Sequence, residues 1–156
     1  MGSILTAITV ILQSAPVFLP GIGLALSPLS TLPIAIAANL SFSLGISIYI
    51  ASVFILLLIH LQEATIFIFT TGILGLVFGA LYQKKSFIFS LLISNITLSM
   101  GILSLVYLIG IMNFVIINNS FLITILMIFI FSLIYTWIWS FILNNFFKYF
   151  KLINFK

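Results

Sequence analysis

The only histidine and the only acidic residue of the chain stand three positions apart. His60 and Glu63 occur in the stretch ILLLIHLQEATIFIFTTG, between two long apolar runs. Such a pair could belong to an active site, to a proton pathway or to a ligand contact. A separation of three residues puts both side chains on one side of a helix end or of a tight turn. The spacing therefore allows chemistry here, and it equally allows a simple capped turn.

The remaining residue types exclude most of these chemistries. A serine protease needs a nucleophile in a Gly-x-Ser-type turn with a histidine in reach, a metalloprotease needs two histidines and a carboxylate, and phosphate chemistry needs arginine or several lysines. The chain has one histidine, one glutamate and no arginine. Proton-coupled transport usually relies on carboxylates within the spans, whereas Glu63 stands at the end of an apolar run. We therefore expect no enzyme, no catalytic residue, no metal site, no cofactor and no self-powered pump.

The composition is that of an integral membrane protein. Of 156 residues, 64% are hydrophobic and only 4% are charged, whereas a soluble domain has about 25% charged residues. At about 20 residues per span, the chain has room for five or six transmembrane helices and for no soluble domain. Because no segment alternates polar and apolar residues, helices are the expected spanning structure. The predicted fold class is a single all-α transmembrane domain covering residues 1–156.

Polar and helix-breaking residues divide the chain into six apolar segments and a tail. The first segment is short and carries Gln13 and Pro16, so it could instead lie at the membrane interface. The predicted spans are 3–19, 22–41, 43–61, 64–82, 87–112 and 120–141, and the interfacial tail is 142–156.

The five lysines predict the orientation of the chain. They form two clusters, Lys84 with Lys85, and Lys148 with Lys151 and Lys156. Two predicted spans separate the clusters, so both can face the cytoplasm, as the positive-inside rule requires. Both termini are then cytoplasmic, in a multi-pass protein of the cell membrane, and we expect a bacterial plasma membrane. The clusters suit the lipid bilayer rather than nucleic acid, which needs a continuous basic surface.

Two predicted spans carry rows of small side chains, which let helices approach closely. Pro28 and Pro33 also interrupt the second segment and free carbonyl groups that lipid cannot satisfy. The interpretation is helix packing, with partner docking or the lining of a substrate site as the alternative. The rows are Gly23, Ser27, Thr31, Ala35 and Asn39 in the second segment, and Gly72, Gly75 and Gly79 in the fourth.

The predicted outer ends of the spans hold the polar residues that could orient a small ligand. A pocket with apolar walls and a few such groups is the usual composition of a small-molecule site. The alternative is that they are solvated loop ends, with Glu63 favoured by the start of the fourth helix. In the fifth span, Asn95 needs either a partner on another helix or a ligand. The candidate ligand-binding residues are His60, Gln62, Glu63, Asn95, Asn113, Asn118 and Asn119.

Residues 20–85 resemble a known family. A proline-rich and small-residue-rich stretch, LSPLSTLPIAIAANLSFSLG, is followed by the polar turn HLQE and by the glycine-rich FTTGILGLVFGALYQKK. This pattern is similar to the S components of energy-coupling factor (ECF) transporters and to the YybS-like group of predicted membrane proteins. The resemblance implies six helices with cytoplasmic termini, a ligand held near the outer face, and docking of the first helix on a transmembrane coupling subunit driven by two ATPases. The family's docking pattern is AxxxA, whereas here Ile11 stands between Ala7 and Ala15.

The expected function is therefore that of a membrane subunit which binds a small molecule at the outer face for uptake by a separately energised transporter. Two alternatives stay open. One is a membrane scaffold or assembly partner in cell-envelope processes, and the other is a small hydrophobic subunit of a respiratory or ATP-synthase-type complex.

Overall fold

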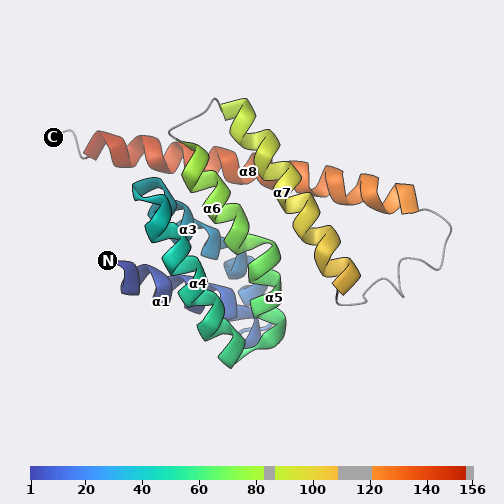
Figure 1. Cartoon of the computed structure of the whole chain (residues 1–156), viewed down its shortest axis with the longest axis horizontal. Coiled ribbons are helices and arrows are strands. Elements are labelled where there is room, and N and C mark those ends of the chain that lie inside the picture. Colours follow the sequence, from blue (N-terminus) through green and yellow to red (C-terminus); the bar gives the residue numbers. More distant parts are fainter. Residues whose placement is uncertain (83–86, 109–120, 154–156) are drawn as a thin grey trace.

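Every regular element that the computed structural model describes is a helix, as Figure 1 shows. The described residues are 1–82, 87–108 and 121–153. The α-helices are α1 (Gly2–Phe18), α2 (Ile22–Leu26), α3 (Thr31–Leu40), α4 (Phe42–Ile59), α5 (Leu61–Phe69), α6 (Thr71–Tyr82), α7 (Phe87–Leu108) and α8 (Phe121–Ile153), and η1 (Ser27–Ser30) is a 3-10 helix. The all-α class predicted from composition is confirmed.

Five helical stretches within the described residues are long and apolar enough to cross a membrane. Each overlaps one of the second to sixth predicted spans, so the protein is a multi-pass membrane helical bundle. The 17 residues of α1 would extend about 25 Å at 1.5 Å per residue, slightly less than a hydrocarbon core of about 30 Å. A sixth crossing stays a prediction. The five stretches are Ile22–Leu40, Phe42–Ile59, Leu61–Tyr82, Ile88–Val106 and Ile123–Lys148.

Two of the predicted spans are broken helices rather than continuous ones. The second begins as α2, tightens into η1 with Pro28 in its first turn, and resumes as α3. The fourth begins at Leu61, earlier than predicted, because His60 is extended and ends α4. It is then interrupted at Thr70, whose φ is −123° and ψ is −88°. The Thr70 hydroxyl donates to the carbonyl of Ile66, a bond within the helix that favours bending.

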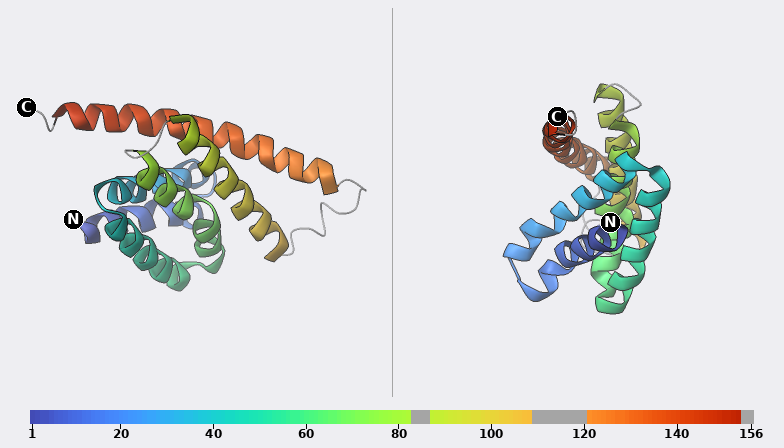
Figure 2. Two further views of the ribbon diagram at one scale, coloured as in Figure 1. Left: turned by 45° about the horizontal axis from the view of Figure 1, so that its top comes forward. Right: turned by 90° about the vertical axis from the view of Figure 1, so that its left-hand side faces the viewer.

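The predicted boundary at residue 141 is not marked by any break. The last span and much of the predicted tail form one helix of 33 residues, α8. Figure 2 shows α8 lying along one side of the bundle and crossing α7. The membrane-length stretch of α8 extends to Lys148, because the residues between 141 and Lys148 include no proline or glycine that would end a helix.

The two rows of small residues lie against each other. α3 and α6 make the most extensive contact between any two elements. A Cβ atom on Gly75 would come within 2.8 Å of the carbonyl oxygen of Thr31, and a Cβ atom on Gly79 would overlap the carbonyl oxygen of Ala35. The two backbones therefore touch directly. They can come this close only because the glycines have no side chain.

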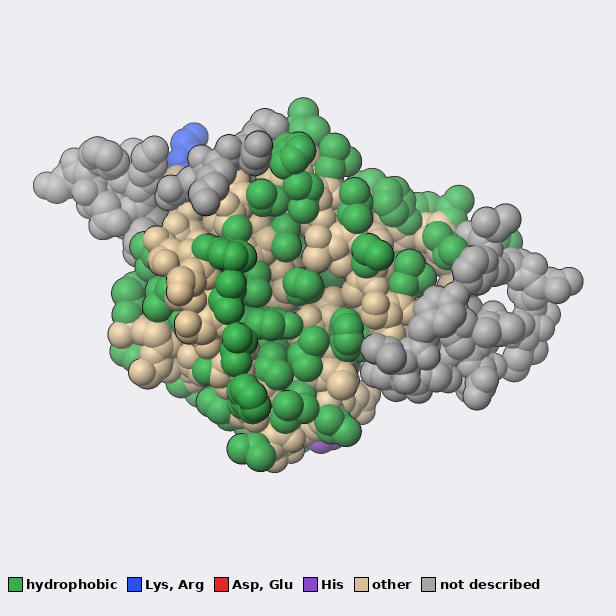
Figure 3. Space-filling model, viewed as in Figure 1, with side chains coloured by type: hydrophobic (Ala, Val, Ile, Leu, Met, Phe, Trp, Pro, Cys, Tyr) green, Lys and Arg blue, Asp and Glu red, His purple; other side chains and the backbone are tan. Residues whose placement is uncertain are grey.

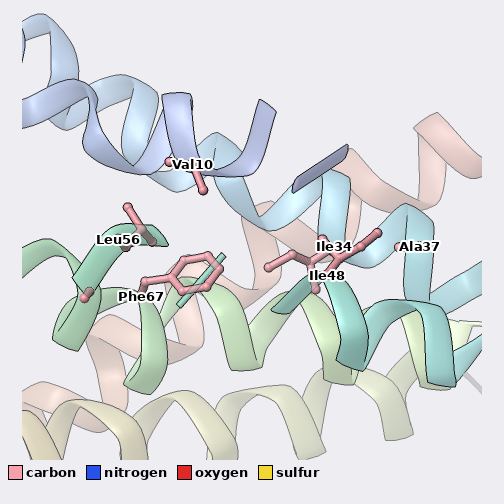
Figure 4. Packing of buried hydrophobic residues seen from close by; sticks show 7 residues of the cluster. Val10, Ile34, Ala37, Ile48, Leu56 and Phe67 are labelled. Atoms are coloured by element: carbon pink, nitrogen blue, oxygen red, sulfur yellow. The ribbon is translucent and has the colours of Figure 1, made fainter. Parts of the chain in front are cut away.

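The apolar core has two parts. The first joins α1, α3, α4 and α5, as Figure 4 shows, and the second joins α3 and α6 to α7 and α8. Large apolar side chains also cover much of the outer surface in Figure 3, as expected of a surface in contact with lipid. The first part contains Val10, Ile34, Ala37, Ile48, Leu56, Ala64 and Phe67, and the second contains Ala35, Leu74, Phe78, Leu98, Trp139, Leu143 and Phe147.

Candidate functional site

Glu63 is buried, so the expectation of a solvated carboxylate at an outer turn is wrong. Its exposed fraction is 8%, and its Oε2 accepts a hydrogen bond from Nε2 of Gln13 at 3.0 Å. Glu63 does lie in the first turn of α5, where the helix dipole favours a carboxylate. The sequence placed Glu63 beside a polar turn, but the packing of α1 against that turn closes the side chain off.

Gln13 is the centre of a hydrogen-bonded network. Its Oε1 accepts hydrogen bonds from the Ser30 hydroxyl at 2.9 Å and from the Thr71 hydroxyl at 2.8 Å. These four side chains come from α1, η1, α5 and α6, and none is more than 8% exposed. With both hydroxyl groups bonded to Oε1, the NH2 group of the amide points to the carboxylate. We call Gln13, Ser30, Glu63 and Thr71 the Glu63 network.

The broken helices bring this network together. Ser30 is the last residue of η1, and Thr71 is the first residue of α6 after the interruption at Thr70. Glu63 lies in the first turn of α5. Three of the four network residues thus sit at the end of a helical piece, and the fourth, Gln13, reaches them from α1.

The chain offers Glu63 little compensation for a negative charge. The hydrogen bond to its carboxylate comes from a neutral amide, and no lysine or arginine precedes Lys84 in the sequence. Removing an unpaired carboxylate from water costs several kcal/mol, whereas one hydrogen bond to a charged group contributes about 1.5–3 kcal/mol. A full negative charge at Glu63 therefore requires a positive partner.

The other residues of the predicted outer turn diverge from Glu63. Gln62 is exposed, and His60 is half-buried at the junction of α4 and α5. The Nδ1 atom of His60 is buried and has no hydrogen-bond partner. Within the described part of the chain, no hydrogen bond joins His60 to Glu63. The structure therefore does not gather the three residues into one site.

Asn95 belongs to a second polar cluster, between α7 and α8. Its Oδ1 accepts a hydrogen bond from the Ser132 hydroxyl at 2.7 Å, and the Ser132 and Ser99 hydroxyl oxygens are 2.5 Å apart. Of the two interpretations of Asn95, the structure shows the hydrogen bond across a helix interface. The candidates Asn113, Asn118 and Asn119 lie outside the described residues.

The small-residue rows are covered by other helices of the same chain. Gly23 lies against the backbone of Ala15 in α1, and Gly72 lies against the Phe67 carbonyl and the Tyr49 ring. Apart from Asn39, which is half-buried, all members of both rows are buried. These faces are therefore occupied by packing within the chain.

Three residues of the Glu63 network were missing from the predicted site. In the sequence, Gln13 only makes the first segment doubtful as a span, and nothing distinguishes Ser30 and Thr71 from the other hydroxyl residues. The available signal was a polar side chain within each of three apolar stretches. No spacing connects them, because Gln13 is 17 residues from Ser30, 50 from Glu63 and 58 from Thr71.

The side chains of the Glu63 network can both donate and accept hydrogen bonds. One carboxyl group, one oriented amide and two hydroxyl groups converge in an apolar surrounding, which suits recognition of a small polar or charged group.

No protein-family model, curated protein or solved structure matches the chain.

Proposed function

We propose that the chain is a membrane-embedded binding subunit, similar to an S component, that captures a small molecule for a separately energised transporter. The observation that supports the proposal most strongly is the buried hydrogen bond between Gln13 and Glu63. An ionisable residue buried in a transmembrane bundle is costly and usually functional. Interrupted helices that meet at such a group are a recurrent design of substrate sites in membrane transport proteins.

Comparison with the second polar cluster supports a role for Glu63 beyond joining helices. Ser132 bonds to Asn95 and Ser99 with neutral groups only, and these bonds hold α7 to α8. Neutral side chains of this kind are the ordinary means of joining membrane helices. Burying a carboxyl group costs desolvation energy, and helices can be joined without that cost. We therefore assign the carboxyl group of Glu63 to ligand binding.

The proposed site lies toward the end of the bundle where α4 meets α5. Glu63 is next in the sequence to Gln62, which is exposed at that end. In the proposed orientation this end faces outward and both chain termini are cytoplasmic, with a coupling subunit and its ATPases as partners. In Figure 3 the histidine and lysine colours lie at opposite edges of the visible face.

Cysteine labelling tests this orientation. The chain has no cysteine, so each introduced thiol is unique. In intact cells an impermeant maleimide should label Gln62→Cys and leave Lys148→Cys unlabelled, and both positions are exposed in the structure. After permeabilisation both should react. Labelling of Lys148→Cys in intact cells would reverse or reject the proposed topology.

Mass spectrometry of the purified protein tests the function. Wild-type protein extracted from its native membrane should carry a small molecule, and Thr71→Val should carry at least about tenfold less, because a disturbed network loses about 1.4 kcal/mol or more of binding free energy. Gln62→Leu is the control and should retain the molecule. An identical set of small molecules in wild type and Thr71→Val, with both folded, would reject a binding role for the network.

A further inference from the structure

We infer that the Glu63 network binds a cation, either a monovalent metal ion or the ammonium group of an organic molecule, whose charge balances Glu63. The inference rests on the proposed function, because it names the class of ligand for the same site. The inference follows from two observations: the hydrogen-bond donors of the network are nearly all in use, whereas several of its acceptors are free.

The donors of the network are nearly exhausted. The hydroxyl protons of Ser30 and Thr71 are directed at Gln13 Oε1, and one N–H of the Gln13 amide is directed at Glu63 Oε2. A single amide N–H is left over. An anion needs several donors or a positive charge nearby, and the side chains of the network supply neither.

In contrast, the network has more hydrogen-bond acceptors than it uses. An ionised carboxylate can accept about four hydrogen bonds, and Glu63 accepts one from the described side chains. The hydroxyl groups of Ser30 and Thr71 donate to Gln13, so the lone pairs of their oxygen atoms are also available as acceptors. Oxygen acceptors together with one negative charge are the ligands that hard cations and ammonium groups prefer.

The positive charge must come from outside the neighbouring helices. The described hydrogen bonds connect Glu63 to neutral Gln13, and α1, η1, α5 and α6 contain no lysine or arginine. His60 is the one side chain before Lys84 in the sequence that can carry a positive charge, and no hydrogen bond joins it to Glu63 within the described residues. A neutral ligand would leave the carboxylate unbalanced, and an anion would add repulsion.

Thermal unfolding of the full chain in detergent, at constant pH and constant chloride concentration, tests this inference. The probes are sodium, potassium, methylammonium and choline chlorides, exchanged against one another at fixed total salt. We expect at least one cation to raise the unfolding temperature of wild-type protein in a saturable manner. Glu63→Gln should weaken that response at least about tenfold, because glutamine keeps the shape of the side chain and removes its charge. Gln62→Leu should respond like wild type.

The identity of the active probe separates the two sources of the cation. A response to sodium or potassium alone indicates an inorganic ion, and a response to methylammonium or choline indicates an organic ammonium group. If Glu63→Gln does not fold, Glu63→Asp retains the charge and should keep the response to the same cation with lower affinity. The inference is overturned if no cation gives a saturable shift in wild type, or if the shift is unchanged in Glu63→Gln. Thr71→Val should weaken the shift, and an unchanged shift in this variant also overturns the inference.

The outcomes also distinguish this inference from the proposed function. A cation response that depends on Glu63, without any co-purified molecule, supports the cation site and rejects the carrier role. A neutral molecule that co-purifies with wild type and is lost from Thr71→Val supports the carrier role and overturns the cation inference.

Discussion

Replacing Gln13 with leucine should destabilise the protein by about 2–4 kcal/mol, because three buried groups lose their partners at once. The hydroxyl groups of Ser30 and Thr71 lose their acceptor, and Glu63 loses its donor. Each buried polar group left unsatisfied costs about 1–3 kcal/mol, and relaxation of the side chains recovers part of that sum. Unfolding by sodium dodecyl sulfate in mixed micelles measures the change.

The chain contains a matched control for this substitution. Gln62 is exposed, so Gln62→Leu makes the same chemical change where no buried partner is lost. It should change the free energy of unfolding by less than about 0.5 kcal/mol, as for most surface substitutions. Equal changes in the free energy of unfolding of the two variants would show that the hydrogen bonds of Gln13 do not stabilise the protein.

Replacing Gly79 with alanine should cost about 1–3 kcal/mol, and leucine should prevent α3 and α6 from packing. The new Cβ atom would overlap the carbonyl oxygen of Ala35 and come within 2.6 Å of the Ala38 Cβ. Neither atom is the end of a flexible side chain, so the two helices must move apart. The same unfolding measurement, together with the fraction of monodisperse protein after extraction, reports the loss.

Gly2 provides the control for this second effect. A Cβ atom there would lie 3.8 Å from the nearest side-chain atom, Leu44 Cδ1, which is an ordinary contact. Gly2→Ala should therefore leave the protein at least as stable, since alanine favours helix over glycine. A neutral Gly79→Ala would mean that the contact between α3 and α6 is looser than the structure shows.

Local sequence features determined the class of fold. Hydropathy is a sum over neighbouring residues, so long apolar runs predicted the helices that the five candidate spans contain. Small side chains are likewise a local property, and the rows that include Thr31, Ala35, Gly75 and Gly79 predicted faces for close packing. The sequence did not say that the two rows are partners, because any pair of such faces could meet.

Local signals also led to errors at the helix boundaries. The interruption falls on Thr70, two residues before Gly72, and the bond from its hydroxyl to the Ile66 carbonyl depends on a side-chain conformation. Similarly, His60 ends α4 in an extended conformation and lets α5 begin at once. Where a helix bends inside an apolar run, the tertiary contacts around it decide the bend.

The candidate site shows the same division. The sequence by itself determined that one carboxylate stands beside a polar turn in a membrane protein, since residue types and hydropathy are read directly from the chain. Only the tertiary structure decided that Glu63 turns inward to Gln13, 50 residues away, and that Ser30 and Thr71 hold the amide between them. The physical reason is that hydropathy adds up along neighbouring residues, whereas the burial of one side chain depends on which distant helices cross over it.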